Sequence, residues 1–374
     1  MNLYKNKEKN FFFLLSGENS DLAYYEFQTI LSLINIPFTF QMSPDSRIVE
    51  LEFPIDVNSD QISENLNKIM NRVTMTHLCC LLIYKSFFKN SIPNSYQKLL
   101  EYINIDYFRD LKPYLNFSVR TKRIGDPEGI FNQKEITLKL NDYLGKQIIT
   151  YNPTKKVNLT NPEEEYKIII STSGIWIGIF LQSSLRNEVR IRVAHKRPFF
   201  HPSSMNPILQ RTMINLSGLN EGELFLDPFC GSGGALIEAN KMKIHGIGIE
   251  IDRKIIWGAY QNLKKDKEVF RNTQLILGDS TKLCFKPCSI SAVITDPPYG
   301  IAASTKGFSL PDLLKQFFIE IKNILRPKSR LVICVPSYIE IEDLGAKILD
   351  AYYKIFFQYV HKSLTRKIIV FQIK

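Results

Sequence analysis

The chain has 374 residues, and its 48 Lys and Arg against 37 Asp and Glu give a net charge of +11. Hydrophobic residues make up 44% and charged residues 23% of the chain, which excludes a largely disordered, collagen-like or coiled-coil protein. At about 150 residues per domain the length indicates two to three domains. The positive charge favours a polyanionic partner, either nucleic acid or an acidic membrane surface.

No apolar run is long enough to cross a bilayer. The stretch 168–181 is interrupted by a Ser-Thr-Ser-Gly sequence and predicts a hairpin. Phe11–Leu15 is too short for the core of a secretory signal and predicts a first strand. We therefore expect a cytoplasmic protein without a membrane partner. The six cysteines form no CxxC pair, so we expect no metal site.

The first 180 residues alternate strand and helix patterns irregularly, which indicates an α+β region. The helix over Asp21–Ile34, for example, carries apolar residues at helical spacing, and Ser59 is suited to cap the next helix. The predicted strands are Phe11–Leu15, Pro37–Gln41, Arg47–Phe53, Thr74–Tyr84, Asn116–Lys122, Glu165–Ser171 and Ile175–Leu181. The predicted helices are Asp21–Ile34, Asp60–Met70, Pro93–Ile103 and Gln133–Leu144.

A basic stretch follows at 186–197, with five Arg and Lys side chains among apolar and aromatic residues. One interpretation is a solvated linker with a few alternating strand positions. The other is a nucleic-acid surface that follows the backbone and offers aromatic platforms. The sequence leaves both open, and on the second interpretation the RNA-binding candidates are Arg190, Arg192, Lys196 and Arg197.

From about Glu221 the pattern becomes regular, with apolar strands alternating with helices. This alternation predicts a parallel sheet covered by helices on both faces. The last two strands have no helix between them and predict an antiparallel hairpin at the sheet edge. The strands are Glu223–Asp227, Gly246–Glu250, Thr273–Leu277, Ala292–Thr295, Leu331–Val335, Tyr353–Val360 and Lys367–Ile373, and helices start at Gly234 and Asp252 and cover Leu310–Leu325.

A glycine-rich loop after the first of these strands predicts a cofactor site. The strand ends in Asp227, and the loop carries Gly231 and Gly233 before a helix begins. Glycines allow a ligand to approach the backbone closely. Because an acid precedes the glycines, a phosphate would be repelled and an ammonium group favoured, which points to S-adenosylmethionine rather than to a dinucleotide. Phe229 in the loop belongs to the same predicted site.

The next two strands also end in acids. Glu250 is positioned to hold two ribose hydroxyls, as the acid of nucleotide-binding βαβ units does, and Asp252 is suited to cap the next helix. Asp279 can accept a hydrogen bond from an adenine amine, and Ser280 lies beside it. Each signal is weak alone, but three acids at three successive strand ends form a consistent set.

The sequence Asp296-Pro297-Pro298-Tyr299 after the fourth strand predicts the catalytic site. A nucleobase amine must regain sp3 character before it attacks a methylsulfonium carbon. Two acceptors, the Asp296 carboxylate and a main-chain carbonyl such as that of Pro297, would hold its N–H groups, and Pro298 would keep them aimed. Tyr299 offers a face on which a flipped base can stack. The sulfonium is itself the electrophile, so the chemistry needs no nucleophile at Cys230.

These motifs resemble the class I methyltransferases with a (D/N)PPY motif: Asp227–Gly233 matches their cofactor loop and Asp296–Tyr299 their target-amine motif. The segment from Arg197 to Met205 and the helix at Pro207–Leu216 resemble the entry to the catalytic domain of THUMP-containing RNA methyltransferases. Asp at position 296 is closest to the archaeal and eukaryotic tRNA (guanine(10)-N2)-methyltransferases. Ile301-Ala302-Ala303 depart from the charged residue that relatives commonly carry there.

The resemblance implies a ferredoxin-like domain at 1–58, a THUMP-like RNA-binding domain at 59–184, a linker and entry helix at 185–220, and a Rossmann-like methyltransferase domain at 221–374. It implies S-adenosylmethionine as the cofactor, tRNA as the substrate, and N2-methyl- or N2,N2-dimethylguanosine as the product. Some relatives require a small activator protein, which is therefore a candidate partner.

Two alternatives remain open. A DNA adenine-N6 or cytosine-N4 methyltransferase shares the core motifs, although the long N-terminal region and the linker favour an RNA enzyme. A non-catalytic RNA-binding protein with a vestigial methyltransferase domain is the other, and the complete set of acids argues against it.

Overall fold

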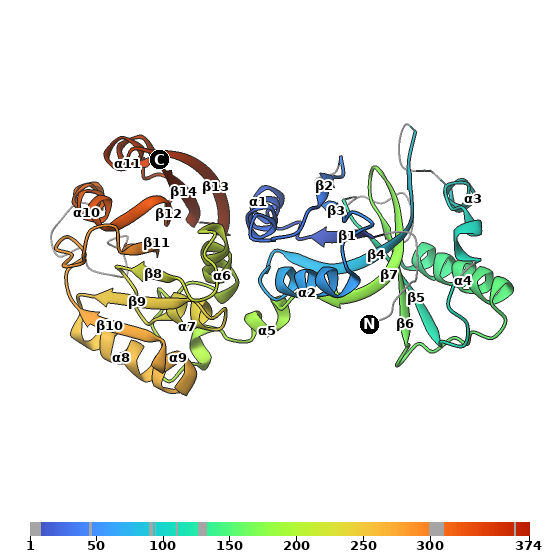
Figure 1. The fold of residues 1–374 in the computed structure, drawn as a ribbon, viewed down its shortest axis with the longest axis horizontal. Coiled ribbons are helices and arrows are strands. Elements are labelled where there is room, and N and C mark those ends of the chain that lie inside the picture. The colour runs from blue at the N-terminus through green and yellow to red at the C-terminus, as the bar shows by residue number, and fades with distance from the viewer. Residues whose placement is uncertain are drawn as a thin grey trace. The chain divides into compact units, whose positions relative to one another are not determined.

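The chain forms two compact units, which differ in the order of their secondary structure (Figure 1). The computed structural model describes residues 9–44, 47–89, 93, 95–109, 111–125, 133–298, 310–362 and 364–374. The first unit contains 1–24, 35–71 and 76–184, and the second contains 25–34, 72–75 and 185–374. Within the described residues, no helix combines the length and apolar character needed to cross a membrane.

The first unit is built on a mixed sheet of seven strands in the order β2-β3-β1-β4-β7-β6-β5. Its first part follows a β-α-β-β-α-β order with antiparallel pairing, the ferredoxin-like arrangement. The elements are β1 (Asn10–Leu15), α1 (Ser20–Leu31), β2 (Thr39–Met42), β3 (Ile48–Glu52), α2 (Ser59–Met70), β4 (Thr76–Phe87), α3 (Tyr96–Leu100), β5 (Phe117–Arg123), α4 (Gln133–Tyr151), β6 (Glu164–Ile170) and β7 (Gly174–Ser183). The part of α1 from residue 25 onward belongs to the second unit.

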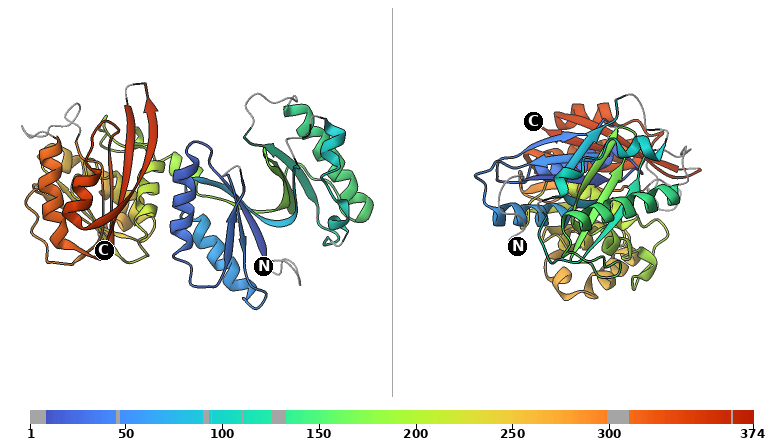
Figure 2. Two further views of the ribbon diagram at one scale, coloured as in Figure 1. Left: turned by 90° about the horizontal axis from the view of Figure 1, so that it is seen from above. Right: turned by 90° about the vertical axis from the view of Figure 1, so that its right-hand side faces the viewer.

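The second unit has a seven-stranded sheet in the order β10-β9-β8-β11-β12-β14-β13. The first five strands of this order are parallel, and β14 and β13 are antiparallel, visible as the red ribbon in the left panel of Figure 2. The elements are α5 (Arg186–Arg190), α6 (Pro207–Leu216), β8 (Leu224–Asp227), α7 (Gly234–Asn240), β9 (His245–Glu250), α8 (Arg253–Lys264), α9 (Lys267–Arg271), β10 (Thr273–Leu277), β11 (Ile290–Thr295), α10 (Leu310–Ile324), β12 (Leu325–Pro336), α11 (Glu342–Leu349), β13 (Ala351–His361) and β14 (Leu364–Ile373).

Alternation along β8 explains why both faces of this sheet are covered. Leu226 packs in the cluster formed by α10, whose buried side chains include Phe317 and Ile321. The neighbouring Phe225 faces the opposite side, where glycines at positions such as Gly246 allow close packing of strand and helix side chains. A strand buried on both faces reads as a continuous apolar run, which is how the sequence predicted it.

The predicted fold class is confirmed: an α+β N-terminal region is followed by a Rossmann-like sheet with an antiparallel hairpin at its edge. Three short helices, α5, α9 and α11, were not predicted, and the strand positions considered for 186–197 are wrong, because α5 and a 3-10 helix at Ala194–Lys196 occupy that stretch. The three boundaries between the four predicted segments stay predictions. The one at 58 falls between β3 and α2, although α2 and β4 complete the β-α-β-β-α-β order.

Candidate functional site

A pocket of about 960 Å³ lies in the second unit at the carboxyl ends of the parallel strands. The strand order reverses between β8 and β11. In α/β sheets, ligands bind in the crevice at this reversal point, outside the carboxyl ends of the strands. Of the predicted residues, the pocket is lined by Asp227, Phe229, Gly231, Glu250, Asp279, Ser280, Asp296, Pro297 and Pro298. The sheet topology thus gathers motifs that are up to 70 positions apart in the sequence.

Asp227 ends β8 and is buried, with 5% of its surface exposed. Its Oδ1 accepts hydrogen bonds from the Thr295 hydroxyl at 2.8 Å and from the Phe229 amide at 3.2 Å. Burial raises the pKa of Asp227 to about 7 despite these two hydrogen bonds, and the negative charges of Asp296 and Glu250 add to the rise. A cationic ligand group beside Asp227 would stabilise the ionised carboxylate and so lower its pKa.

The glycine-rich loop after β8 has the backbone shape that its sequence predicted. Gly231 and Gly233 have positive φ values of 51° and 80°, which side-chain-bearing residues rarely adopt. A Cβ added at Gly231 would meet no described atom within 4 Å, so the loop leaves space for close approach by a ligand. Gly233 does not line the pocket; it caps the start of α7.

Glu250 ends β9 and is held by two backbone amides. Its Oε2 accepts from the Gly231 amide at 3.2 Å, and its Oε1 accepts from the Asp252 amide at 2.9 Å. A carboxylate has about four lone-pair sites, so ligand hydroxyls can still be accepted. The predicted capping role of Asp252 is confirmed, because its Oδ1 accepts from the amides of Lys254 and Ile255 in α8.

Asp279 follows β10, and its side chain is held by hydrogen bonds from Thr281, two residues further along the chain. Its Oδ1 accepts from both the amide and the hydroxyl of Thr281, at 2.9 and 2.7 Å. Ser280 beside it is buried. Both bonds go to Oδ1, and the other carboxylate oxygen is suited to an amine donor.

Asp296 follows β11 and lies in the pocket wall with Pro297 and Pro298. The Arg366 guanidinium of β14 approaches it, with Nη2 at 3.6 Å from Oδ2. Tyr299, the predicted stacking residue, and 301–303 lie outside the described residues. Burial raises the pKa of the Cys230 thiol, which opposes thiolate formation at this position.

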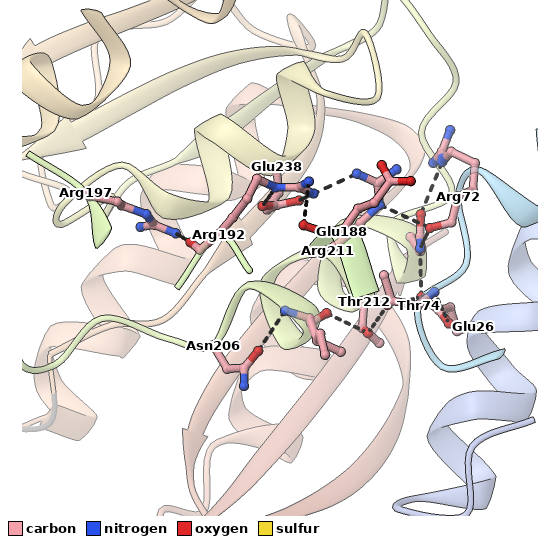
Figure 3. A network of polar contacts seen from close by, with 12 residues as sticks. Glu26, Arg72, Thr74, Glu188, Arg192, Arg197, Asn206, Arg211, Thr212 and Glu238 are labelled. Atoms are coloured by element: carbon pink, nitrogen blue, oxygen red, sulfur yellow. Dashed lines mark hydrogen bonds and ion pairs between the residues drawn. The ribbon is translucent and has the colours of Figure 1, made fainter. Parts of the chain in front are cut away.

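Of the four RNA-binding candidates, two side chains are exposed and two form hydrogen bonds within the unit. Arg190 and Lys196 are exposed. Arg192 donates to both oxygens of the fully buried Glu238, at 2.7 and 2.6 Å, and Arg197 donates to the Arg192 carbonyl at 3.3 Å (Figure 3). None of the four lines the pocket, and their contact with RNA stays a prediction.

A second buried carboxylate, Glu26, anchors segments 25–34 and 72–75 within the same unit (Figure 3). It accepts from the Thr74 amide and hydroxyl, the Met75 amide and Asn215 Nδ2 at 2.7–3.1 Å. Burial raises its pKa although every one of these hydrogen bonds opposes the shift. Arg211 of α6 connects this region with Glu238, because it donates to the Arg72 carbonyl and lies 3.6 Å from the Glu238 carboxylate.

Sequence reasoning missed the pocket residues supplied by the C-terminal strands. Val360 and His361 of β13, Leu364 and Arg366 of β14, and Tyr338 in the turn after β12 line it. His195 and His201 also line it. The sequence placed Arg366 just before the predicted strand Lys367–Ile373 and gave no sign that it reaches the pocket. Among the described residues, no group of three or more His, Cys, Asp or Glu is placed to hold a metal ion.

Two family models match the chain. The UPF0020 model, described as an RMKL-like methyltransferase domain, matches residues 194–368. A model described as DNA methylase matches residues 58–261. The first match contains Asp227, Glu250, Asp279 and Asp296, whereas the second ends before Asp279 and Asp296.

Three relatives carry the name tRNA (guanine(10)-N2)-dimethyltransferase, one of them as a probable enzyme. A tRNA (guanine(10)-N2)-dimethyltransferase of Methanothermobacter thermautotrophicus is 39% identical over 48% of this chain and 52% of its own length, so the chain spans about half of that relative. The enzyme of the same name from Methanocaldococcus jannaschii is 28% identical over 96% of this chain and 99% of its own length. A Methanothermococcus thermolithotrophicus protein, named a probable enzyme of this kind, is 33% identical over 44% of this chain and 97% of its own length.

A solved structure extends the likeness to both units. The crystal structure of TrmN from Thermus thermophilus covers 98% of this chain and 100% of its own, with a TM-score of 0.54 and 15% sequence identity. At that identity the likeness concerns the fold.

Proposed function

Because this chain belongs to the tRNA (guanine(10)-N2)-dimethyltransferase family, we propose that it transfers methyl groups from S-adenosylmethionine to the N2 amine of guanosine 10 in tRNA. The observation that carries the proposal is the meeting of Asp227, Glu250, Asp279 and Asp296 at the ends of four adjacent parallel strands, around one pocket. Each acid faces a different part of the reaction: three suit the cofactor and one suits the amine.

The residues of the pocket fit the cofactor. Asp227 would attract its ammonium group, Glu250 would hold its ribose hydroxyls, and Asp279 with Ser280 would accept the adenine amine. Gly231 provides the close backbone approach, and Phe229, whose ring lies 5.5 Å from that of Phe317, offers an apolar wall. When bound, S-adenosylmethionine supplies an activated methyl group on a positively charged sulfur.

Asp296 and the Pro297 carbonyl would act on the target amine. By accepting its N–H groups they restore electron density to the nitrogen, which forms a bond to the methyl carbon as the carbon–sulfur bond breaks. The nitrogen then loses one proton, to Asp296 or to water. Pro298 restricts the turn that aims both acceptors, and we retain Tyr299 as the residue on which the base stacks.

The proposed tRNA contact beside the pocket uses Arg190 and Lys196, whose side chains are exposed and basic. Arg192 and Arg197 support the same stretch from within, since Arg192 is held on Glu238. Phosphate contacts of this kind would position the tRNA without reading its sequence.

The second candidate is a DNA amino-methyltransferase, favoured by the DNA methylase match over residues 58–261. Tritiated S-adenosylmethionine with tRNA or with duplex DNA separates the two functions. We expect label in tRNA, and nucleoside mass spectrometry with position mapping should find N2-methylguanosine or N2,N2-dimethylguanosine at position 10. Label in DNA alone would contradict the proposal, and absence of cofactor binding would favour the vestigial alternative.

A further inference from the structure

Arg366 reaches the catalytic edge of the sheet because β14 runs against its neighbours. In the β12–β14 pairing Arg366 lies opposite Pro336, while Thr295 of β11 lies opposite Ile333 of β12. The beginning of β14 is therefore at the same edge as the ends of the parallel strands. An antiparallel strand can in this way add a side chain to a site otherwise built by strand ends.

The Arg366 guanidinium and the Asp296 carboxylate are near each other, but their separation exceeds that of a hydrogen bond. Their side chains are 11% and 22% exposed, and both line the pocket. The distance of 3.6 Å is longer than the 2.7–2.9 Å usual for a charge-assisted hydrogen bond. The adjacent Lys367 differs, because its Nζ donates to both oxygens of Glu342 at 2.9 and 2.8 Å. Arg366 thus lies beside the acid, with its Nη2 beyond hydrogen-bond distance of Asp296 Oδ2.

An acid beside a guanidinium offers an acceptor and a donor side by side, and this pattern suits guanine. The amino edge of guanine presents the N2 amine and N1–H as donors, with the O6 acceptor next to them. Adenine and cytosine instead place an acceptor ring nitrogen directly beside the amine, where it would meet the second carboxylate oxygen. Arg has five N–H donors in a planar fork, and a guanine O6 is a frequent partner of Arg.

We propose that Arg366 is a specificity-determining residue, which donates a hydrogen bond to O6 of the target guanine while Asp296 accepts from its N2 amine. The proposal rests on the proposed function, since it needs a guanine in the pocket. It predicts that Arg366 responds to the atom at position 6 of the base, which a residue acting only on Asp296 would not do.

The test compares kcat/KM for tRNA carrying guanosine or 6-thioguanosine at the target position, in the wild type and in Arg366→Met. Sulfur is a weaker acceptor than oxygen, whereas N1–H and the N2 amine are kept. We expect the wild type to prefer guanosine by roughly 10- to 100-fold, the range of a good base contact, and the variant to show a ratio near 1. Lys347→Met on the exposed side of α11 is the matched control and should keep the wild-type ratio.

Three outcomes would overturn the inference. A wild-type ratio near 1 shows that O6 is not read, and this measurement needs no variant. An unchanged ratio in Arg366→Met, with both substrates slowed equally, assigns Arg366 to the support of Asp296 alone. If Arg366→Met does not unfold cooperatively, the comparison is made with Arg366→Gln. An unchanged preference for guanosine in that variant would likewise assign Arg366 to the support of Asp296 alone. Failure of the proposed function looks different, because the wild type would then methylate no guanosine in tRNA.

Discussion

The two ends of the pocket are built differently. At the end proposed to hold the cofactor, Asp227, Glu250 and Asp279 each accept two hydrogen bonds from backbone or hydroxyl groups. At the amine end, Asp296 has a guanidinium at 3.6 Å from another strand. The three acids proposed for the cofactor are thus held by backbone and hydroxyl donors, two of them from other parts of the sheet edge, whereas Asp296 is approached by a guanidinium that the pairing of β12 and β14 brings to the same edge. The difference fits a cofactor bound in one pose and a base that must enter from outside.

The strongest test of this contrast is the loss of the acid at the amine end. Asp296→Ala should lower turnover by about 10²-fold or more, because a preorganised acceptor for the developing charge is removed. Binding of S-adenosylmethionine should change little, since the braced acids are untouched. Single-turnover kinetics and calorimetric cofactor binding on one preparation give both numbers.

Asp296→Asn is the matched control for that variant. It keeps an acceptor oxygen of similar size and should retain more activity than alanine. Turnover of Asp296→Ala at the wild-type rate would contradict the role assigned to the carboxylate. An equal loss of cofactor affinity and turnover in Asp296→Ala would show that this residue also contributes to cofactor binding.

The complementary change is at the cofactor end. Asp227→Asn keeps an oxygen able to accept from Thr295 but removes the charge that would meet an ammonium group. We expect cofactor affinity to fall by roughly 10- to 30-fold, about 1.4–2 kcal/mol, with turnover at saturating cofactor much less affected. Isothermal titration and a kcat against KM comparison would measure this, and a large kcat effect with unchanged KM would contradict it.

The smallest expected effect is the pH dependence of cofactor binding by the wild type. The pKa of Asp227 lies near 7 in the folded protein and near 3.8 as the ordinary value. A cationic ligand binds the ionised form, so affinity should fall roughly five- to ten-fold between pH 7.5 and pH 6, with proton release on binding at the lower pH. Calorimetry in buffers of different ionisation enthalpy detects that proton, and Asp227→Asn should abolish the dependence.

The same shift affects the stability of the free protein with a defined sign. Because the folded pKa of Asp227 is raised, the folded state binds more protons than the unfolded state between about pH 4 and 7. The stability contributed by this group is therefore present below pH 4 and is lost as the pH rises through 7. The pH dependence of urea unfolding, compared between the wild type and Asp227→Asn, isolates that contribution.

Much of the fold, and the meeting of the acidic residues around one pocket, could be predicted because their signals are local. Apolar runs of strand length ending in Asp227, Glu250 and the Asp279 loop indicated both the parallel sheet and the edge where the acids meet. Short helices such as α11 were not predicted, because eight residues give too few turns for a clear apolar periodicity. Arg366 escaped because its position depends on the register between β12 and β14, which no local pattern encodes.

The basic stretch shows the same limit in another form. Five positive charges within twelve residues predicted an exposed strip, yet Arg192 lies on Glu238, a residue 46 positions away. A buried carboxylate in the middle of α7 gives no sequence signal that distinguishes it from an exposed one. Composition thus indicated the charge of this stretch but not which side chains are engaged within the unit.

The Glu26 contacts have a consequence for how this enzyme could be divided or recombined. A fragment starting at residue 185 would keep Asn215 and Arg211 but lose the carboxylate and the carbonyl to which they donate. Each stranded donor costs about 1–3 kcal/mol, a substantial part of the stability of an ordinary domain. Grafting this catalytic half onto a foreign RNA-binding module would therefore require carrying along two short stretches of the N-terminal sequence, so its boundary is a matter of hydrogen bonding as well as of chain order.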